Sequence, residues 1–215
     1  LFKACFIKSV YYSFFDHIHA KCDPTRYIRQ VRLFHEIFRF KRLGLVYENS
    51  IEGRTYAAID DVLLVAKERQ FTISLCEAPF SNVSREQATN HLIDCHKRIA
   101  PNIDALFLTV NRGADFGRMQ EILAPLTAHG VPTWSQRGPK EVRLGVLLSV
   151  ARGGFTAVGR FHAQTMAKIL SGTKPRALPQ IFKDPERIAI NLKTAADIGF
   201  RPPRGLLRVA DEIYK

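Results

Sequence analysis

Ser149 and Cys76 are the two side chains that come nearest to a catalytic nucleophile, since each stands at the end of an apolar stretch. A nucleophile elbow requires G-x-S-x-G, whereas Leu147 and Ala151 occupy the two glycine positions around Ser149. Cys76 lacks the tight glycine turn that would expose a thiolate. We therefore interpret Ser149 as a strand-end hydroxyl and Cys76 as a packed thiol. An α/β enzyme that uses either of them is the least favoured alternative.

Histidine, cysteine and aspartate side chains form no recognisable metal site or acid–base pair. His91 and Cys95 lie one helical turn apart with His96 beside them, but no second ligand pair follows at matching spacing. Asp60 and Asp61 are consecutive in an expected helix, so their carboxylates point in different directions. The sequence therefore predicts no metal and no catalytic residues.

The glycines and cysteines argue against a nucleotide cofactor and against a covalent framework. Gly153, Gly154 and Gly159 match neither G-x-G-x-x-G nor the phosphate-binding loop with its lysine and hydroxyl residue, so no cofactor is predicted. The cysteines form no C-x-x-C pair, and neither a zinc site nor a disulfide framework is indicated. They are Cys5, Cys22, Cys76 and Cys95.

Lysine plus arginine outnumber aspartate plus glutamate by 32 to 20 in this 215-residue chain, and the net charge of +12 raises the question of nucleic acid. Residues 1 to 43 hold nine of the basic side chains. Val31 and Phe34 recur there at helical spacing, which leaves Arg29 and Arg32 on a solvated face. No groove-reading or zinc-finger motif accompanies the charge, so we predict no nucleic-acid partner.

No stretch approaches the roughly 18 uncharged apolar residues that a membrane span needs. The apolar run from Phe6 to Phe15 contains Lys8 and precedes no small-residue cleavage site, which argues against a signal peptide in this chain. Because the first residue is Leu1 and not methionine, we expect a processed, trimmed or partial product.

Apolar stretches of strand length alternate with amphipathic stretches of helix length. Three alternations over residues 43 to 134 predict an α/β fold with a parallel sheet and right-handed crossovers. His162 falls on the apolar face of one helix and is interpreted as a core histidine. Strands are expected over 43–47, 71–76, 103–110, 131–134, 146–150 and 188–192. One expected helix covers 55–69, a second opens at the capping box of Ser84 and Gln87, and a third packs through 119–126. A fourth helix ends at Gly172 and a fifth covers 194–198. The last helix starts from Pro202 and Pro203 and buries Ile213.

Polar side chains follow these strands directly, and a parallel sheet brings such strand ends to one edge. In open α/β sheets ligands bind at the carboxyl ends of the strands. The loop from Ser149 to Phe155 is placed in the same way after its strand. The pattern therefore favours binding over turnover. The polar residues are Glu48, Asn49, Asn111, Arg112, Ser135 and Gln136.

The C-terminal part of the chain carries a series of recognisable motifs. GVLLSVARGGFTAVGRFHAQTMAKILSGTKPRALP, followed by IAINLKTAADIGFRPPRGLLRVADEI, resembles the C-terminal half of the ABC-transporter substrate-binding-like family, which includes tryptophan- and phenylalanine-type binding proteins. The resemblance covers roughly residues 30 to 215. The matching pieces are Val158 to Arg160, Ala167 to Pro179, Ile190 to Ala195 and Leu206 to Glu212.

This resemblance implies the type I periplasmic-binding-protein fold, in which two Rossmann-like lobes close on a small ligand by hinge motion. It also implies a periplasmic or extracytoplasmic location, an ABC permease in the membrane as partner, and no enzymatic activity. The implied ligand is an amino acid, an aromatic compound or a carboxylate-bearing compound. The residues that the resemblance places at the cleft are Tyr47, Glu48, Asn49, Asn111, Arg112, Trp134, Ser135, Ser149 and Arg152.

Two departures from the family pattern qualify these expectations. Amino-acid binders of this kind show a "TD" pair after the third strand and an aspartate in the later loop, where this chain has Val110-Asn111 and Gly154. Arg112 and Arg152 instead favour an anionic ligand. In addition, we expect an incomplete first lobe, because only about 40 residues precede the second lobe, so that the chain is either a fragment or has lost half of the cleft.

The domain expectation follows from that incomplete lobe. Residues 1–42 are expected to be a remnant of the first lobe with a basic helix, 43–142 the second lobe, 143–178 a strand, loop and helix that complete the first lobe, and 179–215 a C-terminal strand and helices. A ligand-sensing regulatory domain of the same fold is the alternative function. No sequence feature indicates the oligomeric state.

Overall fold

The chain forms two compact units in the computed structural model, which describes residues 16–152, 155–183 and 185–215. One unit joins the segment that ends at Arg26 to Arg152–Glu186, and the other joins Tyr27–Ala151 to Arg187–Lys215. Each unit is therefore built from two separate stretches of sequence. The four segments expected from the sequence assign the chain to lobes, and they stay a prediction. The run from residue 6 to 15, Cys5, Gly153 and Gly154 lie outside the described residues.

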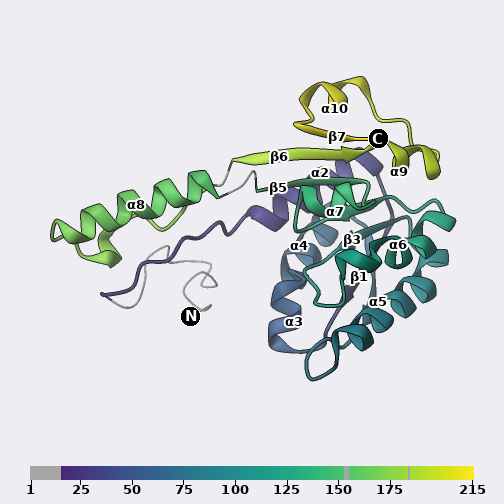
Figure 1. The fold of residues 1–215 in the computed structure, drawn as a ribbon, viewed down its shortest axis with the longest axis horizontal. Helices are drawn as coiled ribbons and strands as arrows, with labels where there is room; N and C mark the ends of the chain where they lie inside the picture. The colour runs from purple at the N-terminus through teal and green to yellow at the C-terminus, as the bar shows by residue number, and fades with distance from the viewer. Residues whose placement is uncertain (1–15, 153–154, 184) are drawn as a thin grey trace. The chain divides into compact units, whose positions relative to one another are not determined.

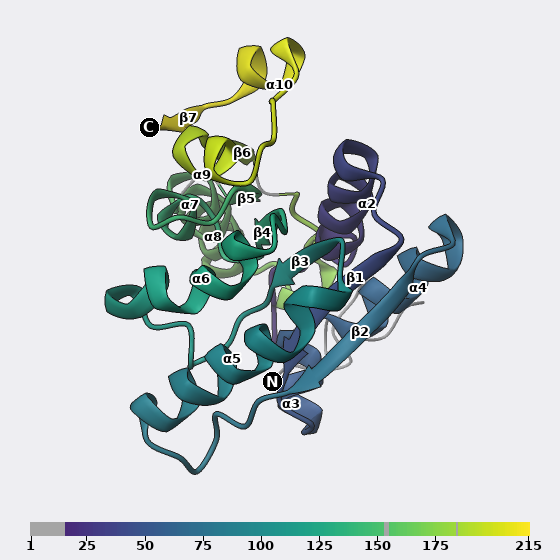
Figure 2. The same ribbon diagram turned by 90° about the vertical axis from the view of Figure 1, so that its right-hand side faces the viewer.

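A seven-stranded sheet forms the centre of the larger unit, with the strand order β2-β1-β3-β4-β5-β6-β7 (Figures 1 and 2). β1 pairs in parallel with β2 and β3, β3 with β4, β4 with β5, and β6 with β7, which confirms the predicted parallel sheet. The strands are β1 (Arg42–Tyr47), β2 (Thr72–Glu77), β3 (Ala105–Leu108), β4 (Thr133–Ser135), β5 (Leu148–Arg152), β6 (Glu186–Asn191) and β7 (Glu212–Tyr214).

Helices cover both faces of this sheet, as a parallel sheet requires. Figure 2 shows α2 and α4 on one face and α5 and α6 on the other. The capping box predicted at the start of α5 is present, with Ser84 and Gln87 bonded to each other's backbone N–H. The helices are α2 (Arg26–Phe38), α3 (Ile51–Tyr56), α4 (Ile59–Arg69), α5 (Arg85–Ile99), α6 (Met119–Ala128), α7 (Pro139–Arg143), α8 (Thr156–Leu170), α9 (Leu192–Asp197) and α10 (Arg204–Val209).

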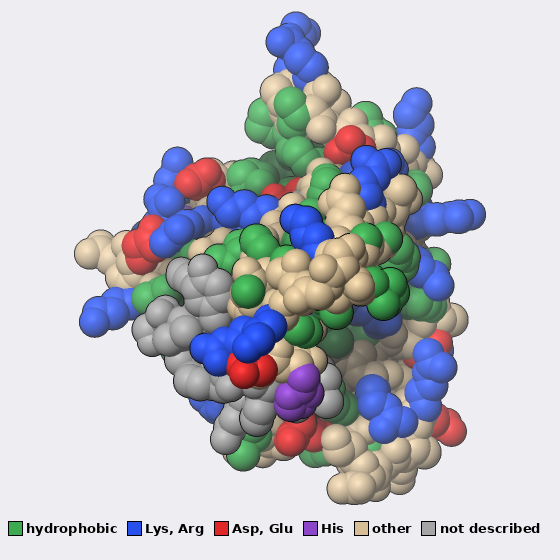
Figure 3. All heavy atoms as spheres, turned by 90° about the vertical axis from the view of Figure 1, so that its left-hand side faces the viewer, with side chains coloured by type: hydrophobic (Ala, Val, Ile, Leu, Met, Phe, Trp, Pro, Cys, Tyr) green, Lys and Arg blue, Asp and Glu red, His purple; other side chains and the backbone are tan. Residues whose placement is uncertain are grey.

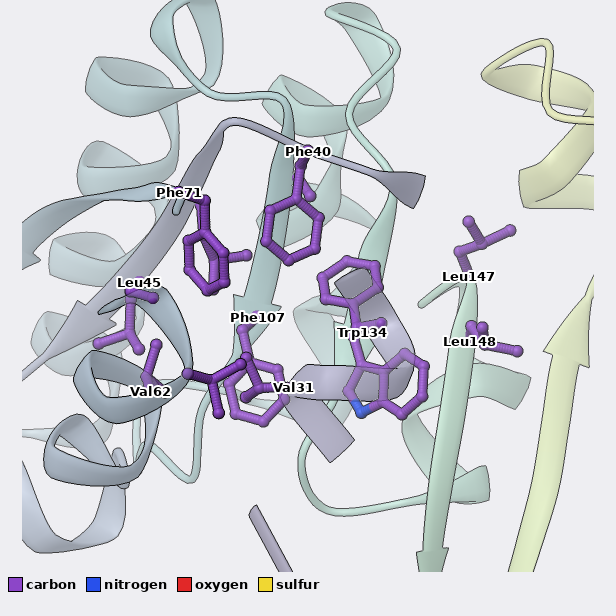
Figure 4. Packing of buried hydrophobic residues seen from close by; sticks show 14 of the residues in the cluster. Val31, Phe40, Leu45, Val62, Phe71, Phe107, Trp134, Leu147 and Leu148 are labelled. Carbon is purple, nitrogen blue, oxygen red and sulfur yellow. The ribbon is translucent and has the colours of Figure 1, made fainter. Parts of the chain in front are cut away.

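An apolar core lies on each face of the sheet, and the side chains of β3 alternate between the two cores. Phe107 packs in the core beneath α2 and α4 (Figure 4). Leu106 and Leu108 belong to the core beneath α5 and α6. The sheet is therefore buried from both sides, which explains why its strands read as continuous apolar runs in the sequence.

Residues 51 to 69 form two helices instead of the single helix expected over 55–69. α3 starts early because the Ser50 hydroxyl accepts the N–H of Gly53 at 2.9 Å. α4 starts after Ala58, whose positive φ of 52° interrupts the helical path. The turn into α3 approaches β1 closely, because a Cβ atom at Gly53 would lie 2.3 Å from the carbonyl oxygen of Glu48. Only glycine fits there.

The C-terminus ends in a strand, so the prediction that Ile213 lies on the buried face of the last helix is wrong. α10 stops at Val209, and Ala210 already has an extended backbone with ψ of 126°. Ile213 lies in β7 opposite Ile190 of β6. The isoleucine and tyrosine of this short segment suit a strand, and pairing with β6 outweighs the helical spacing.

The smaller unit contains α8, none of whose side chains is buried. His162 of α8 is exposed, so the prediction of a core histidine is wrong for this structure. Phe161 stacks on Phe182 with ring centroids 4.7 Å apart. The N–H of Phe182 donates to the carbonyl of Cys22 at 2.9 Å, and this bond joins the two stretches of the unit.

Basic side chains lie among hydrophobic and uncharged ones on the face drawn in Figure 3. In α2, Val31 and Phe34 are fully buried, which confirms the predicted apolar stripe. Arg32 of the same helix lies at the surface with its guanidinium 2.6 Å from Glu68. The charge of this helix is therefore partly neutralised within the chain.

Candidate functional site

The strand order creates a topological switch point between β1 and β3. The chain passes from β1 to β2 on one side and then crosses to β3 on the other. Ligands of open α/β sheets bind outside the carboxyl ends of the strands at such a point. Leu45 lies opposite Phe107 in the register, so the loops after β1 and β3 reach the same edge of the sheet.

Glu48 follows β1 and holds the neighbouring loop in place. One carboxylate oxygen accepts the backbone N–H groups of Phe80 and Ser81 at 2.7 and 2.6 Å, and the other accepts the Ser50 hydroxyl at 3.0 Å. Burial alone would raise the pKa of Glu48, but the hydrogen bonds from Ser81, Phe80 and Ser50 lower it to about 2. Glu48 is therefore a buried carboxylate that the chain itself already binds.

Tyr47 and Asn49, on either side of Glu48, differ in their access to solvent. Tyr47 is buried, and its hydroxyl donates to Glu77 at 3.2 Å. Burial, followed by the Glu77 carboxylate, raises the pKa of Tyr47. Asn49 is exposed. Of the three residues predicted after β1, Asn49 is thus the one with a side chain open to a ligand.

The loop after β3 presents a buried amide and an exposed guanidinium. The Asn111 side-chain oxygen accepts the Gly113 N–H at 2.7 Å, which fixes the orientation of the amide. The Asn111 Nδ2 group is buried and has no hydrogen-bond partner among the described residues. Arg112 is exposed, and no ion pair joins it to a described residue. This loop therefore retains donor groups that the described chain leaves unused.

Gln136 links the loops after β3 and β4, a role that the sequence does not reveal. Its side-chain oxygen accepts the Val110 N–H at 2.7 Å, and its amide nitrogen, Nε2, donates to the Tyr56 carbonyl at 2.9 Å. The side chain is buried. Its place directly after a strand was the available signal, but the partners lie 26 and 80 positions away in sequence.

Trp134 lies inside the core beneath α2, so it is not a side chain at the edge (Figure 4). Its indole has no exposed surface, and its centroid is 5.2 Å from that of Phe34 in α2. The expectation that Trp134 contacts a ligand is therefore not supported. The alternation along β4 directs this side chain under the helix instead of toward the strand end.

Ser135 and Ser149 are buried and hydrogen-bonded within the chain. The Ser149 hydroxyl donates to the Ser135 carbonyl at 3.0 Å, and the Ser135 hydroxyl donates to Glu141 at 2.6 Å. Burial raises the pKa of Glu141, against the lowering effects of Ser135 and Arg137. Both serines thus hold the sheet edge together. Arg152 ends β5, and its side chain is not described.

Cys76 and Cys95 are joined by a disulfide bond, with Cα atoms 5.7 Å apart. Cys22 is also disulfide-bonded. The predictions of a packed thiol at Cys76 and of no disulfide framework are therefore wrong. Pairing required β2 and α5 to be neighbours in the fold, and the 19-residue separation does not reveal this.

The candidate metal ligands on α5 are occupied elsewhere. The disulfide removes Cys95, while His91 and His96 each bond through Nδ1 to a backbone carbonyl, at 2.9 and 2.7 Å. Across the described ranges, no group of three or more histidine, cysteine, aspartate or glutamate side chains could hold a metal ion.

Solved structures with the same architecture include proteins that are distant in sequence. An ABC domain in complex with L-Trp from Streptococcus pneumoniae matches with a TM-score of 0.67 at 19% identity, over 91% of this chain and 64% of that chain. A substrate-binding protein with adhesive properties from Clostridium difficile, in a ligand-free open structure, matches with a TM-score of 0.67 at 15% identity, over 87% and 59%. The chain has the fold of the type I periplasmic binding proteins.

The periplasmic-binding-protein fold also occurs in a regulator among these matches. A probable maltose operon transcriptional repressor from Staphylococcus aureus matches with a TM-score of 0.57 at 16% identity, over 86% of this chain and 65% of that chain. The chain thus spans less than two thirds of the length of each of these three structures. No protein-family model and no curated protein matches the sequence. In the part of the chain that the structure describes, no helix has the length and apolar character to cross a membrane.

Proposed function

We propose that this protein is the solute-binding component of an ABC importer and that it binds a small organic ligand at the carboxyl edge of the sheet. The observation that carries the proposal is the periplasmic-binding-protein fold, whose switch point between β1 and β3 is flanked by polar loops. The ligand is an amino acid, an aromatic compound or a carboxylate-bearing compound. An ABC permease in the membrane is the partner.

Asn49, Asn111 and Arg112 are the residues that we propose to contact this ligand. Asn49 and Arg112 are exposed after the two strands of the switch point, and the Nδ2 group of Asn111, beside Arg112, has no partner in the described part of the chain. A guanidinium and an amide suit a carboxylate oxygen. Arg152 stays a proposed contact from its position at the end of β5.

We propose an extracytoplasmic location, which the disulfide between Cys76 and Cys95 supports. Disulfides form and persist in oxidising compartments and are rare in the reducing cytosol. The Ser149 hydroxyl and the Cys76 sulfur are both bound within the chain, which argues against the enzyme alternative in which either acts as nucleophile.

A thermal-shift screen tests the proposal. The protein is heated with amino acids, aromatic carboxylates and other small acids, and we expect a rise in melting temperature with at least one class. Arg112→Gln should reduce that rise, whereas Arg208→Gln, an exposed arginine of α10, should leave it unchanged. If the folded protein shows no shift with any compound, the solute-binding proposal fails.

A ligand-sensing regulatory domain is the second candidate, and the repressor among the structural matches supports it. Cell fractionation separates the two candidates. A solute-binding protein should be found outside the cytosol with the Cys76–Cys95 disulfide formed. A cytosolic protein with free thiols at both positions would favour the regulator.

A further inference from the structure

Two cations lie against one aromatic ring at the carboxyl edge of β3 and β4. The ring is that of Phe116, in the 3-10 helix η2 (Phe116–Arg118) that follows the loop after β3. The Arg137 guanidinium carbon is 4.9 Å from the Phe116 centroid, and the Lys140 ammonium nitrogen is 4.4 Å from it. Arg137 and Lys140 come from the loop after β4 and from the start of α7.

The carboxylates near this ring are already used by other groups. One oxygen of Asp115 accepts the Gly117 N–H at 2.7 Å, and the other lies 2.7 Å from the Arg85 guanidinium. Lys140 has no carboxylate within ion-pair distance among the described residues. Two positive charges therefore lie against the same ring, and of the two only Arg137 is within ion-pair distance of a carboxylate of the described residues, that of the buried Glu141.

A buried network fixes the loop that carries Arg137. Glu141 has no exposed side-chain surface, and one of its oxygens lies 3.4 Å from the Arg137 guanidinium. Its other oxygen accepts the Ser135 hydroxyl at 2.6 Å. The Ser135 oxygen in turn accepts the Gly138 N–H at 2.8 Å. Glu141 binds Arg137 from the protein interior, so the exposed part of the guanidinium is free to bind a second anion.

We infer that Arg137 and Lys140, which both lie against the half-buried Phe116 ring, form a subsite for an oxyanion of the bound solute. The subsite rests on the proposed solute-binding function and names the class of ligand: an apolar or aromatic body beside Phe116, with a carboxylate or phosphoryl group that contacts the two cations. An anion there is attracted by both cations and offsets their mutual repulsion, so binding is strongest for the charged form of the ligand.

Titration of the isotope-labelled protein tests this subsite. Backbone amide NMR signals of Phe116 and Gly138 are followed during addition of sodium benzoate, inorganic phosphate or neutral benzamide, at constant ionic strength. We expect benzoate or phosphate to move these signals and benzamide to bind more weakly. A dependence on benzoate identifies a carboxylate ligand, and a dependence on phosphate alone identifies a phosphoryl ligand.

Two variants and two controls decide the outcome. Arg137→Gln and Lys140→Gln should each raise the dissociation constant of the bound anion about fivefold or more, which corresponds to one lost charge-assisted contact. Lys140→Gln leaves the buried Glu141 with its cation, so this variant separates an effect on binding from an effect on folding. Arg208→Gln and Lys67→Gln remove exposed charges elsewhere and should have no effect.

Unchanged anion affinity in both Arg137→Gln and Lys140→Gln would overturn the subsite while a positive thermal-shift screen still upheld solute binding. Absence of anion binding to the unaltered protein would overturn it as well. The proposed function itself falls only if the whole panel of compounds leaves the melting temperature unchanged.

Discussion

The Glu48 carboxylate accepts the backbone N–H of Ser81 at 2.6 Å and so joins the end of β1 to the loop after β2, 33 positions along the chain. This contact lies at the switch point where we propose that the ligand binds. It shows that an acidic residue at a strand end can belong to the scaffold. The position of the loop after β2 at this edge of the sheet depends on the Glu48–Ser81 hydrogen bond.

Replacing Glu48 with glutamine should destabilise the protein by about 1–3 kcal/mol, because the N–H groups of Phe80 and Ser81 lose a charged acceptor. The pKa of Glu48 is lowered from 4.5 to about 2, so its stabilising effect is complete above pH 4.5 and is lost as the pH falls toward 2. Urea denaturation at several pH values measures this. Glu52→Gln, at an exposed position of α3, is the control and should change stability little. Equal effects of the two substitutions would contradict the assignment.

His96 should make the free energy of unfolding depend on pH in a higher pH range than Glu48 does. Burial lowers the pKa of this fully buried imidazole to about 4 from 6.5, although the bond to the Ile122 carbonyl opposes the shift. The unfolded chain therefore binds more protons between pH 6.5 and 4, and stability should fall by on the order of 3 kcal/mol as the pH drops through this range.

A matched pair of variants isolates that effect. Because a carbonyl can only accept, the Nδ1 atom of His96 carries the proton, and His96→Asn preserves a donor near this position without the titration. We expect the stability of His96→Asn to vary less between pH 6.5 and 4. His91→Asn, on the outer side of the same helix, should retain the pH dependence of the unaltered protein. Retention of the full dependence in His96→Asn would assign it to another group.

Loss of the Cys76–Cys95 disulfide should cost about 3 kcal/mol, the chain-entropy expectation for a loop of this length. Cys76→Ser, Cys95→Ser and the double variant should lose the same amount, because each removes the one bond. Thermal unfolding under oxidising conditions gives the stabilities, and peptide mass spectrometry gives the pairing. Additive losses in the double variant would mean that the two cysteines act independently.

Gly113→Ala should disturb the loop that carries Asn111 and Arg112. A Cβ atom at Gly113 would lie 2.3 Å from the Ala88 carbonyl oxygen in α5, so the loop must move and stability should fall by about 2 kcal/mol or more. Gly205→Ala is the control, because a Cβ atom at Gly205 meets no atom within 4 Å, and a change below about 1 kcal/mol is expected. Melting curves of both variants test this. A neutral Gly113→Ala would show that the loop tolerates displacement.

Local features of the fold could be predicted from the sequence because the interacting residues are near one another in the chain. The Ser84–Gln87 capping box joins residues three positions apart. The apolar runs of the strands follow directly from burial on both faces of a parallel sheet. The placement of polar residues after the strands likewise identified the edge at which Asn49 and Arg112 are exposed.

The sequence by itself thus determined the order and type of most elements, since side-chain periodicity and capping act over a few residues. Only the tertiary structure decided which strand-end residues are bonded within the scaffold and which are exposed. Trp134 turns into the core, Glu48 binds the loop of a neighbouring strand, and Arg137 and Lys140 meet at Phe116. These contacts join segments that are distant in the chain, and their geometry exists only once the sheet has brought its strand ends to one edge.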